Sequence, residues 1–369
     1  MLQSSSSSST DRLPPTMFLH SLGLAVPARS FAQAEVLQAL EVDPTFATLT
    51  EKSRNLLRKV LSGKNGIERR HLALDEVREA FDFRPDSMMA RFRKHAPHLA
   101  ARAAQHALEN AHLSADQIDA LFVATCTGYL CPGLSSYVAE SLRLPGSASL
   151  LDLVGQGCGA ALPALDQAAA QLQAGRARRV LVVCVEICSA ASYLDDDPGV
   201  LISACLFGDG AAAVVLGSEP SPQGPSVRWA GSARHSAPEH REHLRFDHRR
   251  GLLRNLLSAE VPSLSARHAR TVFDRACADH GRQPHEVCGW IWHAGGREVL
   301  RALRREFQLT DQQTEPSSSV LCHHGNMSSP SCLFALDHAL RNGVPDGLWW
   351  LASFGAGFSS FGAFLEVRR

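Results

Sequence analysis

Short runs of apolar residues alternate along the chain with longer stretches in which apolar residues recur at helical spacing. The runs predict buried strands, and the longer stretches predict amphipathic helices. Up to residue 219 the predicted elements are a strand at 17–27, mostly helical structure at 33–93, a helix at 97–114, strands at 118–128 and 148–154, a helix at 159–175, and strands at 178–187 and 208–219. This alternation predicts βαβ units and a layered α/β fold.

A stretch rich in Pro, Gly and Ser, EPSPQGPS at 219–226, is the best candidate for a linker between two halves. The His/Arg-rich segment that follows, 234–254, has little periodicity and predicts a solvated loop. Beyond it the predicted elements are a helix at 262–281, a strand at 287–296, a helix at 297–307, a loop at 322–332, a helix to about residue 341 and two closing strands. Two α/β halves of comparable size predict an internally duplicated fold, with units at 17–222 and 223–369.

Composition and charge narrow the function classes. The 369 residues are 45% hydrophobic and 20% charged, which is enough apolar material for a large core. Thirty-seven basic residues balance 37 acidic ones, which argues against a nucleic-acid partner. No run approaches the roughly 20 apolar residues of a membrane span. The first residues lack the features of a secretory signal, so we expect a cytoplasmic protein with a disordered serine-rich tail at 1–16.

Ten cysteines occur in the chain, and a reducing cytosol predicts that most are small buried hydrophobes. The sequence contains no CxxC pair. The nearest spacings, Cys126/Cys131 and Cys184/Cys188, are not those of zinc sites, so we expect no structural metal.

One cysteine stands apart, in the segment VGQGCGAALP at 154–163. Cys158 lies between Gly157 and Gly159, where a predicted strand turns into a predicted helix. Backbone N–H groups and the helix dipole at such a turn favour a thiolate with a lowered pKa, and the glycines leave room for a substrate. The pattern therefore predicts a nucleophile. The alternative is a buried structural cysteine in a glycine-rich turn.

Two further polar residues follow predicted strands near glycine turns. His293 stands in WIWHAGGREVL, where an apolar strand runs into a new helix, and Asn326 stands in HHGNMSSPS. Taken singly, a strand-end histidine is more often bonded to backbone, and an asparagine after glycine more often marks a turn. His323 and His324 are rival catalytic histidines, but a pair in a polar loop is more often solvated.

Cys158, His293 and Asn326 form a chemically coherent set. A cysteine paired with a histidine can carry an acyl group as a thioester. The histidine and the asparagine offer two N–H donors without a full negative charge nearby, which suits the enolate formed when a malonyl thioester loses carbon dioxide. That step needs neither a general base nor a metal. The missing acidic member argues against a hydrolytic triad.

From about residue 17 to its end, the chain resembles the chalcone synthase-like, type III polyketide synthases. The resemblance rests on five segments in the family's order: GCGAALPAL, LFGDGAAAVVLG, WIWHAGGREVL, GNMSSPSCLFALD and SFGAGFS. It implies a thiolase-like fold with layers α-β-α-β-α, a homodimer, and iterative decarboxylative condensation of malonyl-CoA onto an acyl-CoA starter. No acyl carrier protein, metal or cofactor is implied. The implied product is a pyrone, a resorcinol or a related phenol, and small residues around the pocket favour an aliphatic or fatty acyl starter.

The resemblance also assigns roles to individual residues. It implies that Cys158 is the nucleophile, and that His293 and Asn326 bind the thioester carbonyl and stabilise the enolate. Phe207 matches an aromatic gatekeeper between the coenzyme A tunnel and the cavity. A second aromatic gatekeeper is expected near 253–256, but LRNL contains no aromatic residue.

Further positions match the family's pocket and cofactor-like substrate site. The residues implied to shape the cavity or bind substrate are Cys126, Thr127, Cys188, Ala191 and Ser328, together with Cys131, which is implied to reach into the partner's cavity. The residues implied to meet coenzyme A phosphates are Lys64 and Arg58, since Leu57 and Val60 fill the other two basic positions.

Three alternatives stay open. A ketoacyl synthase III-like enzyme would use the same three residue types for one condensation on an acyl carrier protein, but GNMSS and FGAGF argue against it. A non-catalytic thiolase-fold binding protein would not need an intact Cys158, His293 and Asn326. A nucleic-acid role for 234–254 is disfavoured by the neutral charge and the lack of interleaved aromatic residues.

Overall fold

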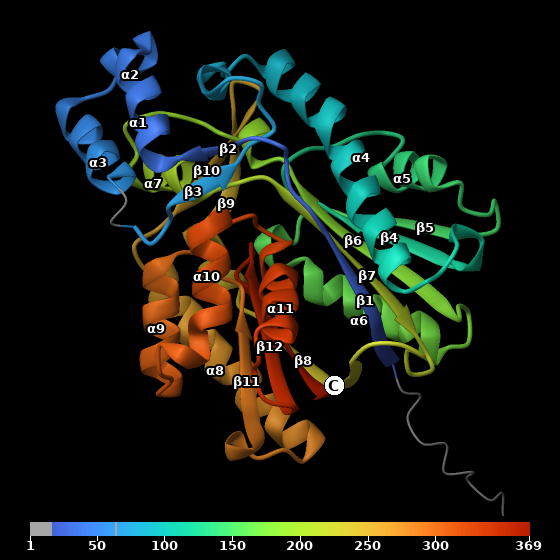
Figure 1. Ribbon diagram of the computed structural model, residues 1–369. Coiled ribbons are helices and arrows are strands. Elements are labelled where there is room, and N and C mark those ends of the chain that lie inside the picture. Colours follow the sequence, from blue (N-terminus) through green and yellow to red (C-terminus); the bar gives the residue numbers. More distant parts are fainter. Residues whose placement is uncertain (1–16, 63–64) are drawn as a thin grey trace, which may run out of the picture.

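A computed structural model describes residues 17–62 and 65–369 (Figure 1). The predicted tail, 1–16, and Lys64 lie outside these residues. Nine strands form one sheet in the order β11-β12-β13-β8-β1-β7-β6-β4-β5. The sheet consists of two half-sheets, joined where β1 and β8 pair over the short stretch Met17–Leu19.

The two half-sheets repeat one pattern of strand pairing. The amino-terminal half-sheet consists of β1 (Met17–Ala25), β4 (Ala120–Ala124), β5 (Ser149–Leu153), β6 (Arg179–Glu186) and β7 (Gly210–Gly217). The carboxy-terminal half-sheet consists of β8 (Ser226–Ser236), β11 (Val287–Trp292), β12 (Gly347–Gly355) and β13 (Ser359–Arg368). In the amino-terminal half, β1 pairs antiparallel with β7, β7 pairs antiparallel with β6, and β6 pairs parallel with β4. In the carboxy-terminal half, β8, β13, β12 and β11 repeat these three pairings in the same order. This repetition supports the proposed division into units at 17–222 and 223–369.

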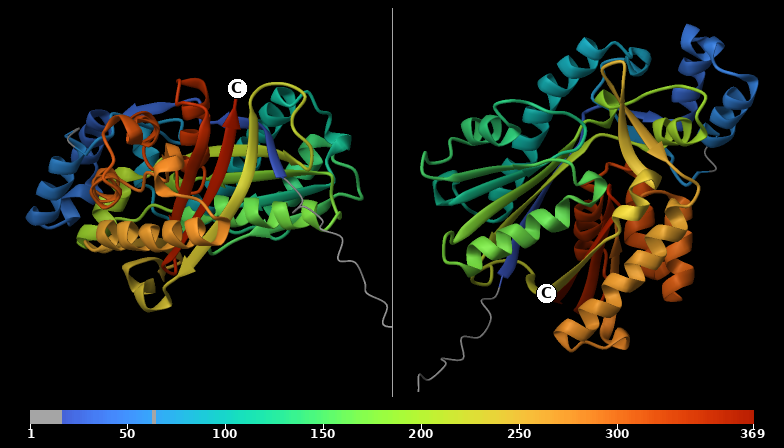
Figure 2. Two further views of the ribbon diagram at one scale, coloured as in Figure 1. Left: turned by 90° about the horizontal axis from the view of Figure 1, so that it is seen from below. Right: turned by 180° about the vertical axis from the view of Figure 1, so that it is seen from behind.

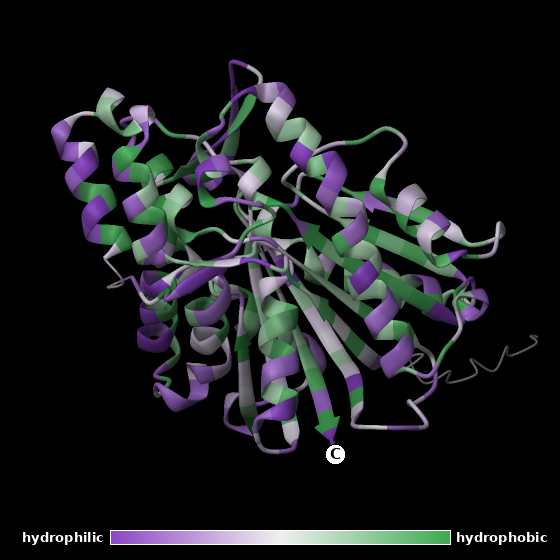
Figure 3. Ribbon diagram, turned by 45° about the horizontal axis from the view of Figure 1, so that its top comes forward, coloured by the Kyte–Doolittle hydropathy of each residue, from purple (hydrophilic) through white to green (hydrophobic). Residues whose placement is uncertain are grey.

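Helices form three layers around the half-sheets (Figures 1 and 2). The outer helices are α4 (Pro85–Asn110) and α5 (Leu134–Leu142) on the first half-sheet, and α8 (Val261–His280) and α9 (Arg297–Phe307) on the second. The central helices are α6 (Ala161–Gln173) and α11 (Ser331–Arg341), whose buried side chains share one apolar cluster with strands of both half-sheets. The arrangement is the predicted α-β-α-β-α, because each half-sheet buries both of its faces. Figure 3 shows that the strands consist mainly of hydrophobic residues, whereas the outer helices combine hydrophobic and hydrophilic residues.

Further elements gather at one end of the half-sheets. They are β2 (Ser30–Ala32), α1 (Gln33–Val42), α2 (Pro44–Thr48), α3 (Glu51–Leu61), β3 (Arg69–His71), α7 (Pro198–Leu206), β9 (Leu244–Arg249), β10 (Leu252–Leu257) and α10 (Glu315–His324). The prediction of a solvated loop at 234–254 is wrong, because β8 extends to Ser236 and β9 and β10 form a hairpin that packs on α7. Leu252 and Asn255 are buried in this contact.

Most predicted strands and helices are present, with some boundaries moved. The helix predicted at 97–114 is the second part of α4, which begins at Pro85 and contains Pro97. Its apolar face packs on β1 and β7, and this burial keeps the helix continuous through the proline. α10 takes up the first residues of the loop predicted at 322–332. No helix in the described part of the chain is long and apolar enough to span a membrane.

Candidate active site

Cys158 lies in a short 3-10 turn, Gly157–Gly159, between β5 and the first turn of α6. The loop after β12 packs closely against this turn. A Cβ atom added to Gly159 would lie 2.9 Å from the backbone nitrogen of Gly355, and one added to Gly355 would lie 2.2 Å from the carbonyl oxygen of Gln156. The glycines therefore let two backbone segments meet, rather than leaving room for a substrate as predicted. This contact holds the turn that carries Cys158 against the carboxy-terminal half.

His293 and Asn326 are both 2% exposed and lie on adjoining segments. His293 directly follows β11, and its backbone N–H donates to the carbonyl oxygen of Ala352 at 2.8 Å. The Asn326 side chain donates from Nδ2 to the carbonyl oxygen of Gly295 at 3.2 Å and accepts at Oδ1 from the N–H of Ser328 at 2.8 Å. These bonds fix the orientation of the carboxamide, whose Nδ2 carries a second N–H.

The structure brings these residues together around one half-open pocket, here called the tunnel. Cys158, His293 and Asn326 all line a tunnel of about 460 Å³. Phe207 lines it too, and its backbone forms a bridge with that of Asn326. Beyond Phe207 lies a second, small cavity of about 30 Å³. Cys158 and Phe207 line both spaces, so the thiol stands where the tunnel meets the small cavity.

The small cavity is lined by residues that the resemblance implies and by others that it does not. The expected residues that line it are Cys126, Thr127, Cys188, Ala191 and Ser328. Cys131 is exposed and lies outside this cavity of its own chain. Residues that were not predicted and that also line it are Tyr193, Leu244, Arg245, Phe246 and Asn255.

The hairpin of β9 and β10 places an aromatic residue at the wall of the small cavity. Asn255 occupies the region 253–256 where an aromatic gatekeeper was expected, and it faces the small cavity. Phe246 is the partner of Asn255 across the hairpin, and its ring lines the same cavity. The aromatic wall therefore comes from β9 instead of β10. Only strand pairing places these two positions side by side.

The tunnel is mainly apolar along its length. Its apolar lining includes Val60, Ile202, Leu206, Leu257, Val261 and Pro262. Its charged lining residues are Arg297 and Glu298, in the first turn of α9. Arg58 instead pairs with Glu41, with 2.7 Å between Nε and Oε1, and does not line the tunnel. Lys64, the other residue implied to bind coenzyme A, lies outside the described residues.

A buried carboxylate lies behind the cavity wall. Glu186, the last residue of β6, has no exposed surface. Its oxygens accept hydrogen bonds from the backbone N–H of Cys126 at 3.0 Å and from the side chains of Thr125, Cys126, Thr127, Ser328 and Ser329. Burial raises the pKa of this carboxyl, and the hydrogen bonds oppose that shift. Sequence reasoning missed Glu186, although a single acid at the end of the apolar run RRVLVVCVEI is a usable signal.

Burial also decides the charge of Cys158 and of His293. It raises the pKa of Cys158 to about 12 and lowers that of His293 to about 4. Hydrogen bonds from Ser328 and from the cysteine's own N–H favour the thiolate but do not outweigh burial. The prediction that the helix dipole lowers the thiol pKa is therefore wrong. At neutral pH the site contains a thiol and a neutral imidazole.

The rival histidines, His323 and His324, do not line the tunnel or the small cavity. His323 is exposed, as predicted. His324 is half-buried and stacks on the ring of His71, with 5.4 Å between the ring centroids. The prediction of a solvated pair is thus wrong for His324, because the end of α10 packs against β3.

Comparison with known proteins assigns the chain to a family. Residues 27–227 match the family model described as FAE1/Type III polyketide synthase-like protein. Residues 232–362 match the model for the C-terminal domain of chalcone and stilbene synthases. The chain belongs to the type III polyketide synthases.

Individual relatives agree with this assignment. The type III polyketide synthase described here is 31% identical over 344 residues to 3,5-dihydroxyphenylacetyl-CoA synthase of Streptomyces toyocaensis, covering 90% of this chain and 84% of that one. It is 27% identical over 349 residues to phloroglucinol synthase of Pseudomonas fluorescens, covering 91% and 97%. The solved structure of PKS-I from the brown alga Ectocarpus siliculosus superposes with a TM-score of 0.86 at 24% identity, covering 97% and 100%.

The predicted family, fold class and enzyme class are confirmed. As a type III polyketide synthase, the protein is an acyltransferase that condenses malonyl-CoA, and its substrates are coenzyme A thioesters. The roles of its individual residues stay predictions.

Proposed function

We propose that this type III polyketide synthase extends a short acyl-CoA starter with malonyl-CoA units on Cys158, while His293 and Asn326 stabilise the enolate. One observation carries the proposal: a thiol, an imidazole and a carboxamide line one tunnel, and the thiol also lines the small cavity. The tunnel accepts the coenzyme A arm, and the small cavity receives the acyl chain.

In the loading step, Cys158 becomes nucleophilic by transferring its proton to His293. Neither residue ionises alone at neutral pH, because burial opposes each charge. The transfer produces a thiolate and an imidazolium together, so the cavity gains no net charge. The thiolate attacks the starter carbonyl, the C–S bond to coenzyme A breaks, and the imidazolium returns its proton to the leaving thiolate.

In the extension step, the thioester oxygen of malonyl-CoA lies between the N–H donors of His293 and Asn326. Loss of carbon dioxide leaves an enolate, whose oxygen these two donors stabilise. The enolate carbon attacks the acyl group on Cys158, forms a C–C bond and expels the cysteine thiolate. A neutral histidine suits this role, since its pKa is lowered to about 4. No electrons are exchanged with another group, so the scheme requires no redox cofactor.

The size of the small cavity favours a short starter. The small cavity, about 30 Å³, offers far less room than the tunnel of about 460 Å³. The fatty acyl starter inferred from small wall residues is therefore disfavoured, because Tyr193, Leu244 and Phe246 fill the space. The names of the Streptomyces toyocaensis and Pseudomonas fluorescens relatives support a small phenolic product.

The proposed function is tested with purified enzyme, malonyl-CoA and acyl-CoA starters of increasing length, without an acyl carrier protein. We expect several condensations per starter, best with the shortest starters, and mass spectrometry identifies the released phenol or pyrone. A single condensation that depends on an acyl carrier protein would establish the ketoacyl synthase III-like alternative. Binding of coenzyme A thioesters without release of free coenzyme A would establish a non-catalytic protein.

We further propose that Arg297 meets the phosphates of coenzyme A. It lines the tunnel from the first turn of α9, where backbone N–H groups also favour an anion. Arg58 pairs with Glu41 and does not line the tunnel, whereas Arg297 pairs with Glu298 at 3.2 Å and does line it. Lys64 keeps its proposed role on the resemblance alone.

Arg297→Glu is expected to raise the KM for malonyl-CoA by about tenfold or more while changing kcat less, because phosphate binding contributes equally to ground and transition states. Steady-state kinetics with malonyl-CoA measure both constants. The matched control is Arg305→Glu, an exposed position on the same helix that does not line the tunnel. A lower kcat with an unchanged KM would remove Arg297 from the coenzyme A site.

We propose that two copies of the chain associate through the edge strand β5. Among the residues that the structure describes, β5 ends the sheet and pairs only with β4. Large apolar side chains are exposed along it and on the neighbouring loop, namely Tyr129, Leu150, Leu151 and Val154. Cys131 is exposed on the same loop, as expected of a residue that reaches towards a partner.

All ten cysteines are free, which supports the predicted reducing, cytoplasmic location.

Leu151→Glu is expected to raise the dissociation constant of this dimer by at least about 100-fold, because two-fold symmetry buries two unpaired carboxylates in one interface. Light scattering coupled to size-exclusion chromatography should give twice the 39.9 kDa chain mass for the unaltered protein and a lower mass for the variant. Val42→Glu is the matched control, since Val42 is 85% exposed on α1, away from β5. The measurement is repeated at decreasing protein concentrations. If the mass of the Leu151→Glu variant equals that of the unaltered protein at every concentration, the interface lies elsewhere.

A further inference from the structure

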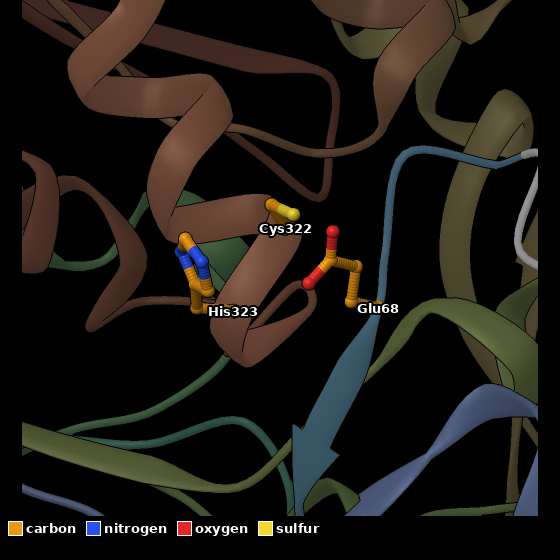
Figure 4. A group of neighbouring side chains, drawn as sticks. All are labelled: Glu68, Cys322 and His323. Carbon is orange, nitrogen blue, oxygen red and sulfur yellow. The ribbon is translucent and has the colours of Figure 1, made fainter.

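Three metal-binding residue types converge on the surface, outside the active site. Glu68 lies directly before β3, and Cys322 and His323 belong to the last turn of α10. One carboxylate oxygen, the thiol sulfur and one ring nitrogen lie within 4.8 Å of one another. Figure 4 shows the Glu68 side chain turned from the start of β3 towards the end of the helix that carries Cys322 and His323. Over residues 17–62 and 65–369 this is the one such group of three.

Hydrogen bonds hold the three donors in place. The backbone N–H of Glu68 donates to the carbonyl oxygen of Cys322 at 2.9 Å, and the Cys322 thiol bonds to the Glu68 carboxylate. Nδ1 of His323 lies 2.9 Å from the carbonyl oxygen of Ser319. Because a carbonyl oxygen only accepts, Nδ1 carries the proton and Nε2 keeps a lone pair. Such a bond from a ring N–H to a backbone carbonyl is typical of histidines that bind metals.

We propose that Glu68, Cys322 and His323 form a binding site for a thiophilic divalent cation of the zinc class. Thiolate sulfur, imidazole nitrogen and carboxylate oxygen are all accepted by Zn²⁺, and the sulfur disfavours hard cations such as Mg²⁺. Binding releases the Cys322 thiol proton to solvent, and a water completes a four-coordinate shell. Metal–ligand bonds of about 2.0–2.3 Å require the donors to close in. Side-chain rotation permits this, since Glu68 and His323 are exposed and Cys322 is half-buried.

Sequence spacing predicts no metal here, because the third donor comes from a distant part of the chain. The fold makes the site by packing α10 against β3. Both segments support the active site: Arg70, in β3, donates to the carbonyl oxygen of Phe207 at 2.8 Å, and Asn326 follows α10 after Gly325. A bound cation therefore joins two segments that flank the tunnel, and it acts as a structural clamp outside the chemistry.

The test uses metal-stripped, full-length enzyme titrated with Co²⁺, whose thiolate complexes show a charge-transfer band in the near ultraviolet. We expect a saturable band that Zn²⁺ abolishes by competition, and a Zn²⁺-dependent rise in Tm. Cys322→Ser should lose the band. Glu68→Gln and His323→Gln should keep a thiolate band but bind Co²⁺ at least about tenfold more weakly.

The matched control is Cys288→Ser, which removes another partly buried thiol, one that lies near the carbonyl oxygens of Pro345 and Leu348. It should bind Co²⁺ like the unaltered protein. A melting curve without metal shows that each variant is folded. The proposal is overturned if the unaltered protein gives no saturable band, if Cys322→Ser keeps it, or if Glu68→Gln and His323→Gln bind with unchanged affinity.

Discussion

Cys158→Ala is expected to lower polyketide formation by at least about 10³-fold while leaving measurable decarboxylation of malonyl-CoA. In the proposed mechanism the thiol carries the acyl chain, so its loss removes every condensation. The donors proposed to stabilise the enolate, His293 and Asn326, stay in place because their backbone and side-chain bonds do not involve Cys158. Product formation is followed by mass spectrometry, and decarboxylation by the conversion of malonyl-CoA to acetyl-CoA.

Cys205→Ala is the matched control for this variant. Burial raises the pKa of Cys205 to about 12, as it does for Cys158, but Cys205 lines neither the tunnel nor the small cavity. This control should keep full activity. Loss of both reactions in a folded Cys158→Ala protein would show that the thiol also takes part in decarboxylation. Residual polyketide that disappears on adding Cys126→Ser would move the nucleophile to Cys126, the other thiol close to Ser328.

Phe246→Ala is expected to shift the preference towards longer acyl-CoA starters by at least about tenfold in the ratio of kcat/KM values. The Phe246 ring lines a cavity of about 30 Å³, and truncation opens space for additional methylene groups. The measurement compares kcat/KM for acetyl-CoA and hexanoyl-CoA in the unaltered protein and in the variant.

Leu256→Ala controls for loosening of the hairpin, since Leu256 lies on the same hairpin but lines neither space. It should leave the starter ratio unchanged. If Phe246→Ala also leaves the ratio unchanged, starter size is not set at the small cavity. If both variants shift it equally, flexibility of the hairpin decides the preference instead of the ring.

The zinc-class site and the polyketide chemistry stand on separate observations. Loss of Co²⁺ binding in Cys322→Ser says nothing about the nucleophile, and loss of product in Cys158→Ala says nothing about the metal. A clamp between β3 and α10 has a consequence for stability, because it adds binding free energy to the folded state alone.

Much of the fold followed from local patterns. Continuous apolar runs predicted the strands at 178–187 and 208–219, because these strands are buried on both faces. The strand at 148–154 was also predicted, although β5 lies at the edge of the sheet and is largely exposed. The helix at 297–307 was placed correctly, since its apolar residues recur on one face and glycines precede it. The hairpin at 244–257 escaped prediction because most of its residues are half-buried, which leaves no clear alternation of buried and exposed positions.

The candidate site, like the fold, was predicted only in part from the sequence. Cys158 and His293 were predicted because each follows a strand at a glycine turn, a local feature that sequence carries. Asn326 was predicted from its glycine turn, but the expectation that it follows a strand is wrong, because it follows the helix α10. Glu186 and Arg297 were missed, since their positions matter only through neighbours distant in the chain. The meeting of Phe246 and Asn255 at one cavity wall depends on hairpin register. The convergence of Glu68 with Cys322 and His323 depends on helix packing.

The sequence by itself determined the family, the order of strands and helices, and the chemical identity of the three residues that face the tunnel. Tertiary structure alone decided the charge of those residues, the volume available to the acyl chain and the surface cluster of possible metal ligands. The physical reason is that burial and volume are properties of packed surroundings: desolvation sets the pKa of Cys158 and His293, and side chains from separate elements set the size of the cavity.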